Sequence, residues 1–118
     1  MTGRGSRTRL MDILERVDAI RVAEARLGKA VDGQDEELLA VCLDAIQYSL
    51  VVIGEAVRGL DAAIIERHSD IPWRDITGMR NLLTHEYFRV SEDVVRAVLD
   101  EPLSLLRGAC LAELDRAG

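Results

Sequence analysis

The chain has 118 residues, of which 48% are hydrophobic but only 3% are aromatic, and its net charge is −6. The apolar residues are therefore mainly Leu, Val, Ile and Ala, a composition typical of one domain of packed helices rather than of a sandwich of strands. The acidic balance excludes strong non-specific binding of nucleic acid through bulk charge, so any RNA contact must come from a local cluster of cations.

The first part of the chain predicts a short arm and then an amphipathic helix. Residues 1–7 are rich in Gly, Ser, Thr and Arg, and we expect them to form a mobile basic arm ahead of a single helical domain over residues 8–118. Apolar residues at helical spacing predict a helix over about residues 8–28. The two glycines and Asp32 that follow predict a loop.

The next predicted helix covers about residues 36–67, with Asp35 as its N-cap, and it carries two apolar rows. One row suits the core of the domain. The second row consists of Leu38, Val41, Ala45, Tyr48, Val52 and Ala56. Because a helix of a globular domain needs only one apolar stripe, we predict that the second row contacts a partner subunit.

Shorter helices are predicted in the rest of the chain. One begins at Pro72, a residue that suits a first helical turn, and ends near residue 85. Another follows Ser91, and a last helix covers about residues 103–114, after Pro102. The expected fold is therefore all-α, an up-and-down bundle of two long helices and shorter C-terminal helices.

The remaining composition indicates a reduced intracellular protein. Cys42 and Cys110 have apolar neighbours in helical patterns, so we expect two reduced core thiols. Metal-ligand spacing, a signal sequence and a window that approaches a membrane span are all absent from the pattern. We therefore expect a cytoplasmic protein with no metal, no cofactor and no membrane partner.

The stretch RNLLTHEY, residues 80–87, places an arginine, a carboxamide, an imidazole and a phenol close together. The imidazole of His85 can take the proton of an RNA 2′-hydroxyl or supply one to the leaving 5′-oxygen. The guanidinium of Arg80 can neutralise charge that builds up on the phosphorus, and Asn81 can orient the phosphate or the histidine. These groups indicate metal-independent RNA cleavage. From spacing alone, a surface polar patch remains the alternative.

Such a cleavage works best with both a base and an acid. The chain has two histidines, and His68 lies outside the motif. We therefore predict a two-fold dimer in which each subunit contributes one His85 to a shared cleft.

The segment from Ile71 to Phe88, IPWRDITGMRNLLTHEYF, resembles the HepT-like toxins of the HEPN superfamily. Their signature is an arginine, a polar neighbour, a histidine five positions after the arginine, and a tyrosine two positions beyond the histidine. Arg80, Asn81, His85 and Tyr87 match it. The preceding segments IPWR, residues 71–74, and GM, residues 78–79, match the family as well. So does IGEA at residues 53–56.

The resemblance implies a HEPN-like helical dimer with paired sites at its interface, and a metal-independent endoribonuclease that acts as a toxin on RNA rather than DNA. It implies that Arg80 and His85 are catalytic and that Asn81 assists them. It also implies a partner, an MntA-like nucleotidyltransferase antitoxin, which neutralises the toxin by transferring AMP from ATP to Tyr87.

Three further residues are candidates for a supporting role. Glu55 either orients Arg80 across the helix pair or forms a buried ion pair without a catalytic role. Arg74 and Arg89 flank the motif and either hold phosphates or are solvated. The alternative function is a non-catalytic helical dimer that binds a nucleotidyltransferase and serves as its substrate or scaffold.

Overall fold

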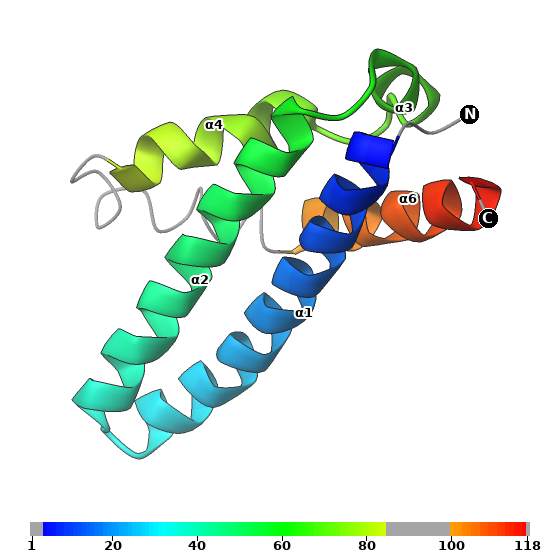
Figure 1. Ribbon diagram of the computed structural model, residues 1–118. Coiled ribbons are helices and arrows are strands. Elements are labelled where there is room, and N and C mark those ends of the chain that lie inside the picture. The colour runs from blue at the N-terminus through cyan, green and yellow to red at the C-terminus, as the bar shows by residue number, and fades with distance from the viewer. Residues whose placement is uncertain (1–3, 85–99, 118) are drawn as a thin grey trace.

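The computed structural model describes residues 4–84 and 100–117. Its helices are α1 (Arg4–Asp32), α2 (Glu36–Arg58), α3 (Ala62–Arg67), α4 (Trp73–Thr84) and α6 (Glu101–Ala117). The two long helices, α1 and α2, form an antiparallel hairpin, α4 packs on α2, and α6 packs on α1 (Figure 1). The described residues contain no strand, which confirms the all-α class with two long helices and shorter later ones. The two-fold dimer stays a prediction.

The connection between the long helices is short and well capped. Gln34 has a φ of 55°, which reverses the chain after Gly33. Asp35 is the N-cap of α2, as predicted, and its Oδ1 accepts a hydrogen bond from the N–H of Leu38 at 3.0 Å. Two glutamates in the first turn of α2 add favourable charge at the positive end of the helix dipole. The hairpin is therefore set by local chemistry at its tip.

The first helix is longer than the sequence predicts at both ends. It begins at Arg4, so residues 4–7, which were assigned to the arm, are helical, while residues 1–3 lie outside the described part of the chain. Ser6 is buried, and its hydroxyl accepts a hydrogen bond from the N–H of Asp61 at 3.2 Å. At the other end the helix runs through Gly28, and Ala30, two residues later, is buried and continues the packed face.

The predicted helix over residues 36–67 is two helices, α2 and α3, so the prediction of one long helix is wrong. The break is at Gly59, where an added Cβ would lie 2.2 Å from Cζ of Arg9. A glycine thus lets the Arg9 side chain cross the end of α2. Beyond the break, Asp61 has an extended backbone, and Leu60 and Ile64 are both buried. The apolar row continues through the break, so spacing alone did not reveal it.

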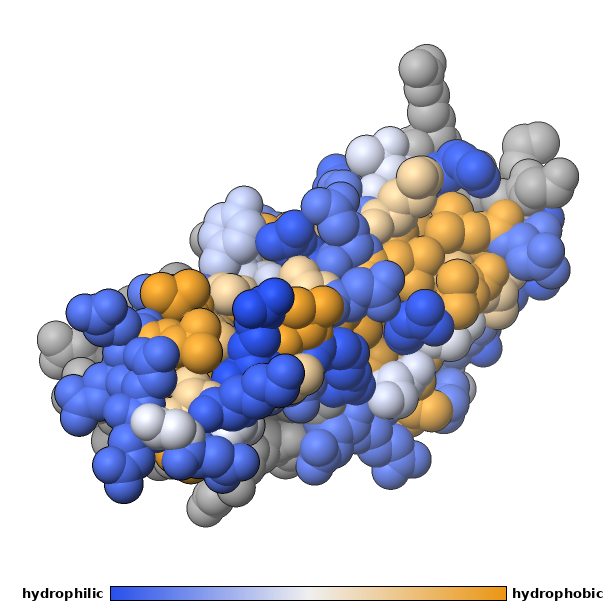
Figure 2. Space-filling view, turned by 90° about the horizontal axis from the view of Figure 1, so that it is seen from below, coloured by the Kyte–Doolittle hydropathy of each residue, from blue (hydrophilic) through white to orange (hydrophobic). Residues whose placement is uncertain are grey.

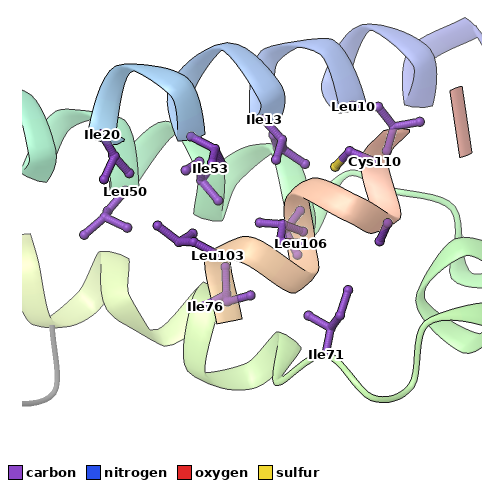
Figure 3. Close-up of a cluster of buried hydrophobic side chains, with 14 of the residues drawn as sticks. Leu10, Ile13, Ile20, Leu50, Ile53, Ile71, Ile76, Leu103, Leu106 and Cys110 are labelled. Carbon is purple, nitrogen blue, oxygen red and sulfur yellow. The ribbon is translucent and has the colours of Figure 1, made fainter. Parts of the chain in front are cut away.

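The core lies between the α1–α2 hairpin and a second layer formed by α4 and α6. Figure 3 shows side chains of α1 and α2 pointing toward side chains of α4 and α6. The residues at this contact are at most 1% exposed; they include Ile13, Ile20, Leu50, Ile53, Ile76, Leu103 and Leu106. Both cysteines are buried free thiols, as predicted. Burial, with a contribution from the nearby Glu113, raises the pKa of Cys110 to about 12, so this thiol stays protonated.

The opposite face of the hairpin, turned away from α4 and α6, is called here the open face. Its exposed residues are Asp12, Glu15, Val22, Arg26, Lys29, Val41, Ala45 and Tyr48. Val22, Val41 and Tyr48 are each more than half exposed. Seen from below, apolar side chains reach the surface in patches among hydrophilic ones (Figure 2). Much of the second apolar row of α2 therefore lies on a surface that the described residues leave exposed.

By length and composition alone, α2 could cross a membrane, contrary to the sequence prediction that no such window exists. The apolar stretch is the one that packs against α1 and α4 in the fold. The length and apolar character of α2 are therefore explained by its packing in the long hairpin. A single helix of this kind is weak evidence for a membrane partner.

Candidate active site

The motif begins on α4. Arg80 and Asn81 occupy consecutive positions of this helix, which extends to Thr84. His85, Tyr87 and Arg89 lie outside the described residues. The proximity of Arg80 to His85 and the accessibility of Tyr87 therefore stay predictions. The described part of the site is the scaffold that holds the motif helix.

The N-terminal half of α4 is anchored in the protein. Ile76 is 1% exposed and belongs to the core. The indole Nε1 of Trp73 donates a hydrogen bond to the backbone carbonyl of His68 at 2.9 Å, and the ring packs against the core. The hydroxyl of Thr77 donates to the carbonyl of Trp73 at 3.0 Å. Trp73 is thus a packing residue, and the helix that carries Arg80 leaves the core in a fixed direction.

A buried carboxylate fixes the segment just before α4. Glu113, on α6, is only 2% exposed. Its two oxygens accept hydrogen bonds from Arg67, one of them from Nε at 3.1 Å, and Oε2 also lies 2.8 Å from Nε2 of His68. The hydrogen bond from Arg67, followed by that from His68, outweighs desolvation and lowers the pKa of Glu113 to about 2. The carboxylate is therefore ionised at neutral pH and holds both partners.

This cluster connects α3, α6 and the start of α4. His68 is held through its ring by Glu113 and through its carbonyl by Trp73. His68 was predicted to lie outside the motif, and Glu113 was not among the predicted site residues. A signal was present, because Glu113 follows Leu106 by seven residues and Cys110 by three, on the core-facing row of its helix. A carboxylate at such a position requires a cationic partner.

The candidate supporting residues differ in what the structure shows. Glu55 is exposed on α2, so an ion pair of this side chain would not be a buried one, and its role stays a prediction. Arg74 is exposed in the first turn of α4. Six residues separate it from Arg80, which corresponds to about 9 Å along the helix. The described residues hold no group of His, Cys, Asp or Glu that could bind a metal ion.

Residues 11–112 match the model of the family described as ribonuclease HepT-like, a range that includes every candidate site residue. The chain belongs to the HepT-like family. The resemblance of the motif segment is thereby confirmed at the level of the whole domain.

Individual relatives share parts of this HepT-like chain. A protein of Caldanaerobacter subterraneus named as a candidate RNase is 40% identical over 67 residues, which cover 57% of this chain and 60% of the relative. The probable ribonuclease HepT of Thermococcus cleftensis is 34% identical over 64 residues, covering 54% of this chain and 58% of the relative. The matches thus span about three-fifths of these relatives. No solved structure matches the chain.

Proposed function

We propose that the chain is a metal-independent endoribonuclease of the HepT-like family. The observation that carries the proposal is the string Arg80, Asn81, His85 and Tyr87, present at the signature spacing in a chain whose family match spans residues 11–112. The anchoring of α4 by Trp73 supports it, because a catalytic guanidinium has to be held on a rigid element.

The proposed reaction uses the RNA as its own nucleophile. His85 takes the proton of a 2′-hydroxyl, and the 2′-oxygen attacks the adjacent phosphorus. Arg80 neutralises the negative charge that develops on the phosphoryl oxygens. The bond from phosphorus to the 5′-oxygen breaks, and that oxygen receives a proton. The products are a 2′,3′-cyclic phosphate and a free 5′-hydroxyl.

The reaction requires an acid as well as a base, and we propose a two-fold dimer that supplies both. One His85 acts as base and the His85 of a second copy acts as acid across a shared cleft. Because the net charge is −6, the chain cannot hold RNA through its overall charge, so the proposed site has to bind RNA through a local cluster of cations.

The proposed biological role is that of a cytoplasmic toxin under covalent control. A nucleotidyltransferase partner would move AMP from ATP to Tyr87: the phenol oxygen bonds to the α-phosphorus, pyrophosphate leaves, and the phenol proton is released. The added phosphate charge beside Arg80 would obstruct the RNA backbone. The motif tyrosine and the family match support this role.

The cleavage proposal is tested with purified protein and RNA in EDTA. We expect the wild type to cut RNA, and His85→Ala and Arg80→Ala each to lose at least about 100-fold in rate, the usual contribution of a catalytic proton-transfer or charge-stabilising group. Arg116→Ala, at an exposed arginine of α6, is the matched control and should cut like the wild type. Full activity of His85→Ala would exclude the mechanism, and an inert wild type would favour the non-catalytic alternative.

The modification proposal is tested with the partner enzyme, ATP and intact mass spectrometry. The chain offers its own control, because its other tyrosine, Tyr48, is 62% exposed. Tyr48→Phe should still gain AMP, whereas Tyr87→Phe should not. AMP that remains on Tyr87→Phe would contradict the assigned site.

A further inference from the structure

The open face combines exposed apolar residues with charges of opposite sign at its two ends. Val22, Val41 and Tyr48 are 56%, 64% and 62% exposed and lie near the middle of the hairpin. Exposure of several large apolar side chains on one face is typical of an interaction surface. The charges around that surface indicate which partner would bind there.

The charges are divided along α1. Asp12 and Glu15 lie toward one end of the open face, and Arg26 and Lys29 lie toward the other. Glu15 and Arg26 are eleven residues apart, which is about 16 Å along the helix, so they are too distant to pair within one chain. Arg16 bonds to Glu15 at 3.0 Å and lies over the ring of Tyr48, at 5.6 Å from its centroid. The Glu15 side chain nevertheless remains 71% exposed.

The two charged ends of the open face lie at equal distances from one position along the hairpin. Residues 12 and 29, and residues 15 and 26, are both centred between residues 20 and 21. Arg16 lies beside Tyr48. Farther along, Arg26 and Leu38 line one groove. The level between residues 20 and 21 therefore corresponds to about residue 44 of α2. That level is also the middle of the pair Val41 and Tyr48.

A surface of this kind is complementary to itself. A two-fold axis that lies in the plane of the open face, perpendicular to the helices and at this level, makes α1 antiparallel to α1 of a second copy. Each acidic end then faces the basic end of the other copy, twice per contact. The same operation places Val41 opposite Tyr48 on the two copies of α2. One axis thus brings Asp12 and Glu15 opposite Arg26 and Lys29, and Val41 opposite Tyr48.

We propose that a second copy of this chain docks on the open face in this antiparallel register. The contact is distinct from a pairing of the motif, because α4 packs on the other side of the hairpin (Figure 3). The chain would then have two surfaces for self-association, one around the motif and one on the open face. The second surface does not depend on RNA cleavage.

The test is a charge exchange on the full chain. One variant, Arg26→Glu with Lys29→Glu, carries acidic residues at both ends of the open face. A second variant, Asp12→Lys with Glu15→Lys, carries basic residues at both ends. All four side chains are exposed, so both variants should fold, and far-UV circular dichroism checks this. Sedimentation equilibrium gives the molecular mass of each variant alone and of an equimolar mixture.

The proposed contact predicts a specific set of masses. Each variant alone should have half the mass of the wild-type assembly, because like charges face one another. The mixture should recover the wild-type mass, since each acidic end then meets a basic end of the other variant. A wild type that is monomeric at micromolar concentration would overturn the proposal. So would variants that keep the wild-type mass, or a mixture that fails to recover it.

Discussion

The two faces of the α1–α2 hairpin have similar apolar spacing but different surroundings. On the covered face, Leu50 and Ile53 are at most 1% exposed, because α4 and α6 pack over them. On the open face, Val41 and Tyr48 are more than 60% exposed. The comparison shows that helical periodicity reports that a row is apolar and does not report what covers it. In this molecule one row belongs to the core and much of the other row is exposed.

The largest expected effect is a difference in stability between substitutions on the two faces. Leu50→Ala should destabilise the fold by about 2–5 kcal/mol, because it leaves a cavity in a packed core. Val41→Ala, the matched change on the open face, should alter the free energy of unfolding by about 0.5 kcal/mol or less. Urea unfolding at low protein concentration measures both values. Equal losses for the two variants would mean that the open face is covered within one chain.

The protein also contains a buried carboxylate, Glu113, whose protonation at low pH should lower the stability of the fold. Glu113 has a lowered pKa of about 2, set by its hydrogen bonds from Arg67 and His68. Its stabilisation, about 2–3 kcal/mol, is fully present above the unfolded pKa and is lost as the pH falls from about 4.5 through 2. The difference in unfolding free energy between wild type and Glu113→Gln should therefore shrink over that range.

This acid dependence is checked by urea unfolding of both proteins at several pH values between 7 and 2. A difference that stays constant with pH would mean that Glu113 is not an ionised partner of Arg67 in the folded chain.

The smallest expected effect belongs to a charged pair on the surface. Arg107 donates from Nε to Asp18 Oδ1 at 3.2 Å, and the two side chains are 47% and 62% exposed. Water and salt screen such pairs, so Arg107→Ala should cost less than about 1 kcal/mol. Thermal unfolding in low and high salt measures it. A loss as large as that of Leu50→Ala would show that this pair is not simply solvated.

Much of the fold could be predicted from local sequence signals. Asp35 as an N-cap, Pro72 just before α4 and the apolar rows on the long helices all correspond to observed features. Two of the failures have a common cause, since they depend on contacts between distant residues. Gly59 ends α2 where Arg9 crosses it, and Ser6 extends α1 because it meets Asp61. Neither contact is visible in a local window.

The candidate site likewise has one part that local sequence signals predict and another that depends on contacts between distant residues. The motif from Arg80 to Tyr87 could be found because its residues are close in sequence and match a family signature. The support of the motif helix could not be found in this way. Glu113 is 45 residues from His68, and Trp73 reaches His68 through a backbone carbonyl. The sequence thus identified the candidate reacting groups, and the fold identified what holds the helix that carries Arg80 in place.

The most direct measurement of the central claim compares two substrates of one sequence in EDTA. The first is an RNA, and the second is the same chain with 2′-O-methyl groups at every position. Attack by the 2′-oxygen predicts that the protein cuts the RNA, leaves 2′,3′-cyclic phosphate ends and does not cut the methylated chain. Cleavage of the methylated chain, or RNA cleavage that persists in Arg80→Ala at the wild-type rate, would contradict the account.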